Sequence, residues 1–410
     1  MLAMLRYGGV ILAVAGAALV GAPSAVAAPR PANVTVSGPA EGLPLPTPLL
    51  CALPAGAKLD AMAAWELRPV RGPKALRLPA QLTAGPDGGL CVAFCLPSQP
   101  AGEERALRLR LVRLAAQPAP AFRLDEADAK HLHLAEGEQR VLTYNFGMLL
   151  PEGVPEDRRR SSYVHPLYGL DGEQLSDDFP RDHYHHRGLF WAWPRCKVGD
   201  RAFDVWTLGG GGQRFERWLG RETGPVCALF GVENGWYVGD RRVARETAWI
   251  RVWPAGDVGR AVDVDLTFAA LDGPVEILGA AGKGYGGLGL RFAPRQDTLI
   301  TIEEGPQTAD SNMKRSPWAD LSARFADREA FSGAAIFEDS GNPGAPNGWT
   351  LRPYGYLGVN WPGLEPYVLQ PGQPIRERYR LWLHRGDFAA GQVLAAYEAF
   401  AHPPQAQTGG

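Results

Sequence analysis

Short runs in which apolar and polar residues alternate recur along the chain, and they constrain its fold more than any other feature. Residues 107–111 alternate strictly as Leu-Arg-Leu-Arg-Leu, and similar runs occupy residues 246–252, 262–268 and 378–384. A period of two is typical of strands with one buried face. Clusters of turn-forming residues, such as 209–212, separate the runs. The pattern predicts a mainly β protein built of antiparallel sandwiches.

One amphipathic helix is predicted close to the end of the chain, over residues 388–401. Val393, Tyr397 and Phe400 fall at positions i, i+4 and i+7, which places them on one stripe of a helix. The polar tail that follows, residues 403–410, is expected to be disordered.

The first 27 residues have the features of a secretory signal peptide. A basic stretch ends at Arg6, an apolar run extends from Val10 to Val20, and Ala25-Val26-Ala27 fits the pattern that signal peptidase cuts. The run is short for a membrane span, and no later stretch is apolar for long enough to cross a bilayer. An uncleaved N-terminal anchor is the alternative. We therefore expect an exported protein, periplasmic or extracellular, with no membrane span after signal removal.

Two domains are expected after the signal peptide, because the remaining roughly 380 residues exceed what one core usually accommodates. A proline-rich joint, Gln117-Pro118-Ala119-Pro120, predicts the boundary. Residues 28–117 are expected to form a small immunoglobulin-like β-sandwich. Residues 118–402 are expected to form a large antiparallel β-sandwich.

The charge and cysteine content narrow the expected partners. A formal net charge of −2, with acids and bases interspersed, gives no electrostatic footprint for nucleic acid. The odd number of cysteines leaves at least one thiol without an intramolecular partner. Buried free thiols are favoured, and a disulfide from Cys51 to Cys91 or Cys95 is the alternative that an oxidising compartment permits.

The densest group of chemically active side chains lies in one short segment of the second domain, residues 182–187. Its candidate catalytic residues are Asp182, His183, His185, His186 and Arg187. On a strand His183 and His185 would face one side, whereas on a loop all of these side chains could converge. A solvated turn is the plain alternative, but packing alone does not explain this density.

Histidine supports two kinds of chemistry near neutral pH, proton transfer and metal binding. Proton transfer needs one imidazole poised by a carboxylate, and Asp182 is the neighbouring candidate. A divalent metal would need several ligands around one ion, for which His183, His185 and His165 are the candidate set. Arg187 could bind a carboxylate or phosphate through its planar fork.

Further segments supply candidate substrate-binding residues. The glycine-rich run 282–289 is not a phosphate-binding P-loop, because no Lys-Ser/Thr pair closes it and a strand is expected to follow. An aromatic and polar stretch over residues 352–361 suits a sugar-binding wall, although an aromatic core explains it equally well. The candidate substrate-binding residues are His165, Tyr184, Lys283, Tyr285, Arg352, Tyr354, Asn360 and Trp361.

Several segments together resemble the soluble PmoA-like family. They are Asp178-Phe179-Pro180, the segment from Asp182 to Leu189, Gly286 to Phe292, Trp318-Ala319-Asp320 and Arg352 to Gly355. The resemblance covers residues 132–400. The family carries the inherited label "methane oxygenase PmoA" and is otherwise a domain of unknown function. The PmoA subunit of methane monooxygenase is a polytopic membrane protein, so the label does not suit this chain.

The resemblance implies a fold similar to the galactose-mutarotase-like supersandwiches, which handle sugars in epimerases, lyases and accessory modules. Fold alone does not fix function. The sequence therefore predicts an exported carbohydrate-active protein that binds a small molecule or oligosaccharide and acts by proton transfer. His183 or His185 would be the base, Asp182 its orienting partner, Arg187 the clamp on an anion, and Tyr184 or Tyr285 the acid.

Two other functions fit the same residues. In a non-catalytic carbohydrate-binding or structural module, the histidine cluster would hold the fold together through buried hydrogen bonds. In a metal-dependent oxidase, as the family label suggests, the cluster would bind copper or iron. The one cofactor that the sequence suggests is a divalent metal.

Overall fold

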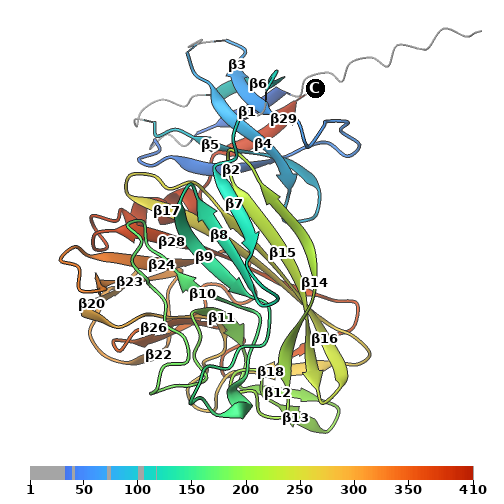
Figure 1. Cartoon of the computed structure of the whole chain (residues 1–410), viewed down its shortest axis with the longest axis vertical. Coiled ribbons are helices and arrows are strands. Elements are labelled where there is room, and N and C mark those ends of the chain that lie inside the picture. The colour runs from blue at the N-terminus through green and yellow to red at the C-terminus, as the bar shows by residue number, and fades with distance from the viewer. Residues whose placement is uncertain (1–32, 39–41, 72–74, 100–105, 117, 410) are drawn as a thin grey trace, which may run out of the picture. The chain divides into compact units, whose positions relative to one another are not determined.

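The regular secondary structure of the computed structural model is almost entirely antiparallel strand (Figure 1), which confirms the mainly β, sandwich-like fold. It describes residues 33–38, 42–71, 75–99, 106–116 and 118–409. The expected signal peptide, residues 1–27, lies outside the described residues. Within the described ranges, no helix is long and apolar enough to cross a membrane.

The N-terminal strands form a seven-stranded sheet in the order β2-β5-β4-β3-β6-β1-β29. Strand β4 pairs with β3 through its first residues and with β5 through its last. It thereby joins the strands on its two sides into one sheet. The alternating run 107–111 lies in β6, where Leu109 and Leu111 are buried and the arginines are exposed. The strands are β1 (Asn33–Ser37), β2 (Thr47–Ala52), β3 (Trp65–Pro69), β4 (Leu78–Ala84), β5 (Leu90–Leu96), β6 (Ala106–Arg113) and β29 (Gln405–Gly409).

The end of the chain corrects one expectation. Residues 405–409, expected to be disordered, form β29 and pair in antiparallel register with all five residues of β1. Thr408 donates a hydrogen bond to the carbonyl of Ala52 at 3.2 Å, so β29 also reaches β2. Main-chain pairing fixes this segment, and an apolar pattern is not needed for it.

Two nine-stranded antiparallel sheets make up the larger sandwich. The first runs β22-β25-β26-β19-β11-β10-β9-β8-β7 and the second β14-β15-β16-β17-β28-β24-β23-β20-β21. The first contains β7 (Phe122–Glu126), β8 (His131–Glu136), β9 (Gln139–Asn145), β10 (Tyr163–Leu167), β11 (Leu189–Ala192), β19 (Gly287–Arg291), β22 (Ser311–Arg315), β25 (Gly348–Arg352) and β26 (Tyr356–Asn360). The second contains β14 (Gly212–Thr223), β15 (Ala228–Val238), β16 (Arg241–Val252), β17 (Gly259–Ala270), β20 (Arg295–Ile302), β21 (Gly305–Gln307), β23 (Trp318–Phe325), β24 (Ser332–Glu338) and β28 (Ile375–Arg385).

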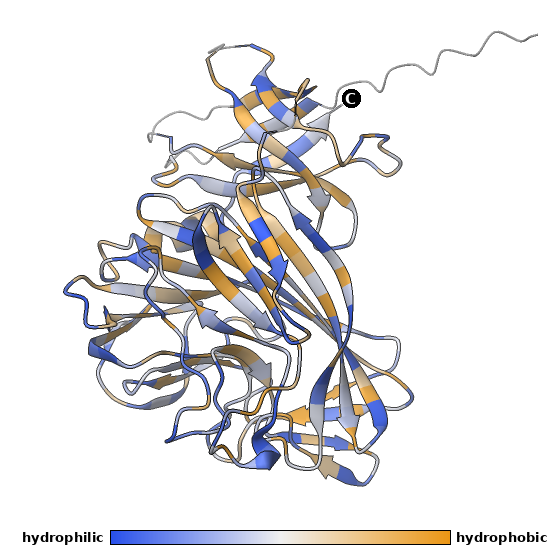
Figure 2. Ribbon diagram, viewed as in Figure 1, coloured by the Kyte–Doolittle hydropathy of each residue, from blue (hydrophilic) through white to orange (hydrophobic). Residues whose placement is uncertain are grey.

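A four-stranded sheet completes the β structure. It has the order β13-β12-β18-β27 and contains β12 (Arg195–Val198), β13 (Arg201–Phe203), β18 (Val275–Leu278) and β27 (Tyr367–Leu369). A short 3-10 turn, Glu156–Arg158, precedes β10. Hydrophobic and hydrophilic residues alternate along the long strands (Figure 2), as expected where one face of a sheet is buried.

The core of the sandwich contains a buried carboxylate. Glu246 on β16 has no exposed surface, and it accepts hydrogen bonds from Trp191, Gln213, Asn234 and Trp236 at 2.7–2.8 Å. Trp191 lies on the first sheet and the other donors on the second. The network therefore joins the two layers through a buried polar group that is fully paired.

The α-helix that the described residues contain, α1 (Val393–Ala401), begins five residues later than predicted. Gln392 has φ of +47°, and residues 388–392 form turns instead of helix. The predicted apolar stripe is confirmed. Val393 is buried, and Tyr397 and Phe400 pack against Phe337 with ring centroids 5.6 and 5.9 Å apart.

All five cysteines are free in the structure. Cys51, Cys91, Cys196 and Cys227 are buried and Cys95 is half-buried. The favoured interpretation of buried free thiols therefore describes four of the five.

Removal of β29 should expose the edge of the small sheet. Deletion of residues 405–410 leaves β1 with β6 as its one remaining partner, and we expect the amides of residues 33–37 to exchange with deuterium at least ten-fold faster. The lost main-chain pairing corresponds to about 2–4 kcal/mol at about 0.5–1.5 kcal/mol for each hydrogen bond. Hydrogen exchange with mass spectrometry measures this. Gln407→Thr, which keeps the strand, is the control, and equal protection in both variants would contradict the pairing.

Candidate functional site

The histidine segment is a loop between two neighbouring strands of the first nine-stranded sheet, β10 and β11. Two successive turns shape it, because the amide of His183 donates to the carbonyl of Pro180 at 2.9 Å and the amide of His186 to the carbonyl of His183 at 2.8 Å. Of the two geometries that the sequence allowed, strand or loop, the structure has the loop. The three imidazole rings converge, with centroids 4.7–5.6 Å apart.

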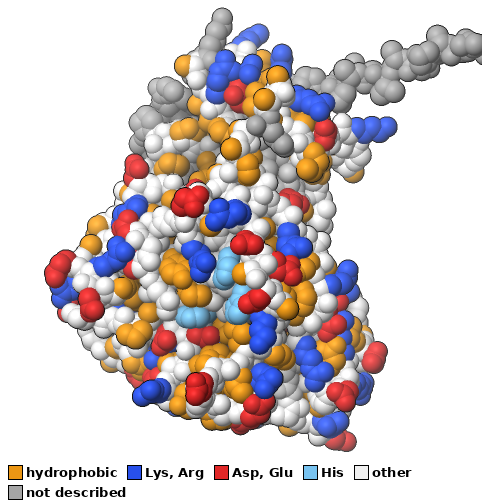
Figure 3. All heavy atoms as spheres, in the orientation of Figure 1, with side chains coloured by type: hydrophobic (Ala, Val, Ile, Leu, Met, Phe, Trp, Pro, Cys, Tyr) orange, Lys and Arg blue, Asp and Glu red, His pale blue; other side chains and the backbone are white. Residues whose placement is uncertain are grey.

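Four rings form a stack that runs from the surface into the core, in the order Tyr354, His183, His186, Tyr356. Successive ring centroids lie 5.3, 4.7 and 4.8 Å apart, with interplanar angles of 11°, 5° and 22°. Tyr354 is 40% exposed, whereas His186 and Tyr356 are buried. In Figure 3, histidine side chains reach the surface of this face among acidic and basic groups. The outer end of the stack is therefore open to a ligand.

Both tyrosines of the stack come from the hairpin of β25 and β26. Gly355 lies between them with φ of +105°, a conformation that L side chains rarely adopt. A Cβ atom at this position would also lie 2.1 Å from the guanidinium of Arg295. Glycine is thus required for the turn that presents Tyr354 outside and Tyr356 inside.

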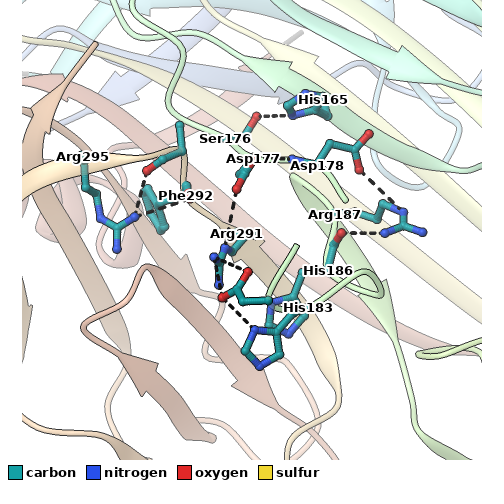
Figure 4. Close-up of polar contacts among 12 residues, drawn as sticks. His165, Ser176, Asp177, Asp178, His183, His186, Arg187, Arg291, Phe292 and Arg295 are labelled. Carbon is teal, nitrogen blue, oxygen red and sulfur yellow. Dashed lines mark hydrogen bonds and ion pairs between the residues drawn. The ribbon is translucent and has the colours of Figure 1, made fainter. Parts of the chain in front are cut away.

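Asp182 links the outer histidine to an arginine that the sequence reasoning missed. The Nδ1 atom of His183 lies 2.9 Å from Asp182 Oδ2, and Arg291 Nη2 donates to both carboxylate oxygens at 3.0 and 3.1 Å (Figure 4). Burial alone would raise the pKa of Asp182. The hydrogen bond from His183 and the charge of Arg291 outweigh it and hold that pKa below its usual range. The carboxylate is therefore ionised beside His183.

The two inner histidines are held neutral. Burial, reinforced by the positive charges of His183 and nearby arginines, lowers the pKa of His185 to about 4. Burial is also the main cause that holds the pKa of His186 well below its usual value. The Nδ1 atom of His186 is buried and has no hydrogen-bond partner among the described residues. Trp206 packs edge-on against His186, with centroids 6.1 Å apart.

Arg187 does not face a ligand, which corrects its predicted role as an anion clamp. The side chain has no exposed surface, and its terminal nitrogens donate to the carbonyls of Tyr184, His186 and Arg158 at 2.6–2.8 Å. Its guanidinium lies 3.5 Å from the centre of the Phe179 ring. Because these groups use its donors, Arg187 shapes the loop from inside.

The predicted metal ligands do not form a metal site. His165 lies on β10, where its Nδ1 atom is 3.0 Å from Ser176 Oγ, and in Figure 4 it lies away from His183 and His186. The rings of His183 and His185 meet edge to face. Within the described ranges, no group of three or more His, Cys, Asp or Glu side chains is arranged to hold a metal ion. The set His183, His185 and His165 is therefore wrong as a set of ligands in this geometry.

The glycine-rich run 282–289 reaches the site through one residue, Tyr285. Tyr285 is half-buried and packs against Trp206 with centroids 5.1 Å apart, while Lys283 is exposed in the preceding turn. Tyr184 is half-buried and contributes its main-chain carbonyl to Arg187.

Three predicted wall residues are structural. Arg352 is mostly buried and donates to the Ser311 carbonyl and to Asn312 at 2.7 and 2.6 Å. Asn360 is buried and pairs with Thr350, and Trp361 is 5% exposed in the core. Of the stretch 352–361, only Tyr354 presents a ring to the surface beside His183. For Tyr356 and Trp361, which are buried, the alternative of an aromatic core is correct.

Two residues of the site, Trp206 and Arg291, were not predicted from the sequence as site residues. Arg291 lies inside a segment that carries the family resemblance, residues 286–292, and this was the available signal for it. Trp206 carries no local signal, because its importance comes from its contact with His186. Tyr356 belongs to the predicted aromatic stretch 352–361, where it is buried against His186.

Comparison with known proteins identifies one family for most of the chain. Residues 131–398 match the model of a family of unknown function, DUF6807. No curated protein matches the chain significantly. An α-mannosidase from Enterococcus faecalis V583 is similar at 10% identity and a TM-score of 0.39. That match covers 93% of this chain and 46% of the mannosidase, so the chain spans about half of its length.

A second solved structure is the outer membrane protein OmpT of Vibrio cholerae, with 10% identity, a TM-score of 0.09, and coverage of 87% of this chain and 98% of that one. Both TM-scores are too low to support an argument from either protein.

The neutral state of His185 should make stability depend on pH. Its folded pKa of about 4 lies below the unfolded value near 6.5, so the unfolded chain binds more protons between these values. Its contribution to stability is complete above about pH 6.5 and is lost as the pH falls towards 4. His185→Gln should reduce the loss of unfolding free energy between pH 7.5 and pH 5 by about 1–2 kcal/mol. Urea unfolding at both pH values measures this, and an unchanged difference would contradict the lowered pKa.

Proposed function

The chain belongs to the DUF6807 family of unknown function, and we propose that it is an exported carbohydrate-active enzyme that acts by proton transfer on a sugar or oligosaccharide. The reaction is of the lyase, epimerase or mutarotase type. Export is inferred from the signal-like N-terminus, and the sugar from the resemblance to PmoA-like and galactose-mutarotase-like domains.

The pairing of Asp182 with His183 carries the proposal. Asp182 accepts from Nδ1 of His183, which leaves Nε2, an atom with no partner among the described residues, as the acceptor for a substrate proton. The side chain of His183 is 35% exposed, so a ligand can reach it. An imidazole oriented by a carboxylate is the usual arrangement of a general base.

The chemical step follows from these positions. Nε2 of His183 takes a proton from the substrate, and the ionised carboxylate of Asp182 stabilises the imidazolium that forms. Tyr354 stacks on His183, and burial raises its pKa, so the phenol keeps its proton. It can then give that proton to the sugar oxygen whose bond breaks. Tyr354 takes the place of Tyr184 and Tyr285 as the acid, because it stacks directly on the base.

The exposed ring of Tyr354 also suits a sugar, since the apolar face of a pyranose packs well on an aromatic surface. His185 and His186 lie next to the base and stay neutral. Their role in the proposal is to form an uncharged wall beside His183 and to exclude water. Arg187 contributes by holding the loop.

A non-catalytic carbohydrate-binding module is the second candidate function. One observation favours it: most polar groups around the cluster, including those of Arg187 and Arg352, are used within the fold. In that function Tyr354 would bind the sugar and the dyad would only shape the surface. A metal-dependent oxidase is not proposed, because the predicted ligands do not come together.

The two functions differ in what happens to the substrate. We expect the mature protein to convert at least one uronate-containing or keto-sugar oligosaccharide in a screen monitored by NMR. His183→Gln should lower kcat by roughly 100-fold or more, as expected for loss of a general base. His133→Gln, on β8 outside the cluster, is the matched control. Binding without conversion by the wild type, or equal rates in His183→Gln, would favour the binding module.

The orienting role of Asp182 can be tested by its effect on kcat, on KM and on the pH–rate profile. Asp182→Asn keeps the shape of the side chain but removes the charge that stabilises the imidazolium. We expect kcat to fall about 10- to 100-fold, by analogy with neutralised carboxylates in other dyads, while KM changes little. Because His183 remains the base, the acidic limb of the pH–rate profile should persist but move to lower pH, since the imidazolium loses a stabilising negative neighbour. A variant that changes only KM would place Asp182 in binding instead.

A further inference from the structure

A hollow of about 490 Å³ borders the loop between β13 and β14, which also contacts the histidine cluster. Residues 204–211 form this loop. Trp206 packs against His186, whereas Leu208 and the glycines at 210–212 line the hollow. The volume is within the usual range of a small-molecule site, about 300–1,000 Å³.

Cations dominate the charged lining of the hollow, which contains Arg159, Arg201, Arg214 and a single carboxylate, Asp157. Arg201, at the start of β13, is exposed and has no hydrogen-bond or ion-pair partner in the described part of the chain. Arg159 is paired with the exposed Glu156. Arg214 donates from Nη2 to the carbonyl of Gly239 at 3.0 Å, and its ion-pair partner is Asp240, 3.9 Å away on a fully exposed side chain. Such an exposed pair contributes little.

An aromatic ring stands beside these cations. The guanidinium of Arg214 lies 4.3 Å from the centre of the Tyr237 ring, and this contact holds it at the wall of the hollow. Tyr237 donates its own hydroxyl to Glu216 at 2.6 Å, so its ring, and not its hydroxyl, is what a ligand would meet.

The glycine run lets the main chain at the wall of the hollow pack closely. A Cβ atom at Gly211 would lie 2.7 Å from the Phe203 ring and 2.9 Å from the Tyr237 carbonyl, so no larger residue fits. Gly210 has φ of +72°, which also favours glycine. The main chain therefore passes close to β13 and β15 at this wall.

We propose that this hollow binds the carboxylate of an acidic saccharide unit. The free fork of Arg201 matches the planar geometry of a carboxylate, Arg214 adds a second positive charge, and Tyr237 with Leu208 offers an apolar surface for the sugar ring. The saccharide part of this inference rests on the proposed function; the preference for an anion rests on the hollow alone.

Isothermal titration of the mature protein with trigalacturonate, its neutral methyl ester and inorganic sulfate tests this. We expect trigalacturonate to bind at least ten-fold more tightly than the ester or sulfate. Arg201→Ala should weaken its binding about ten-fold, and the double variant with Arg214→Ala should abolish it. Arg245→Ala, an exposed arginine on β16 without a partner, is the control and should bind like the wild type.

Equal binding by the double variant, or equal affinity for the methyl ester, overturns the inference. Equal affinity for sulfate also overturns it, because the site would then be a general anion site. The titration is repeated in His183→Gln, where binding in the hollow should persist. If the wild type binds trigalacturonate through Arg201 but the screen shows no conversion, the proposed function fails and the subsite stands.

Discussion

The buried guanidinium of Arg187 is the interaction on which the geometry of the site depends. It donates to three main-chain carbonyls, two within the histidine loop and one at Arg158, and so fixes where the loop turns. Its charge is balanced by Asp178, whose carboxylate is 3.7 Å away. Loss of one partner of such a pair leaves a buried charge uncompensated, at a cost of about 3–5 kcal/mol. The loop conformation is therefore coupled to the stability of the fold.

Because Arg187 fixes the loop from inside, the inner side chains of the site are rigid and the outer ones are accessible. His186 and Tyr356 are buried behind His183, so the base rests on a packed ring and cannot turn freely. Arg291 and Asp182 hold the other side of the imidazole. The outer edge of His183 and the ring of Tyr354 face the surface, beside the exposed carboxylate of Asp182. A catalytic group must be held close to its productive geometry by its surroundings, and this arrangement provides that.

The sequence predicted the sheets well because burial on one face leaves a period of two, as in residues 107–111. It could not predict β29, since Gln-Ala-Gln-Thr-Gly has no apolar pattern and is fixed by main-chain pairing. The histidine loop was found from its density of polar groups. The roles of the two arginines at the site were not predicted. Arg187 and Arg291 have the same side chain, and only their surroundings in the fold distinguish them. The stacking of Tyr354 on His183 was also not predicted, because Tyr354 comes from a hairpin far along the chain from the histidine loop.

Charge balance at the cluster has a consequence for how a ligand would be attracted. His185 and His186 are held neutral, Arg187 is buried, and Arg291 is paired with Asp182, so these four residues present no unpaired positive charge to solvent. Within the histidine loop, Arg181 is the exposed cation that an anionic substrate would meet. Further exposed cations line the hollow beside residues 204–211. If the anion of a substrate binds to these arginines, Nε2 of His183 remains available for the substrate proton alone.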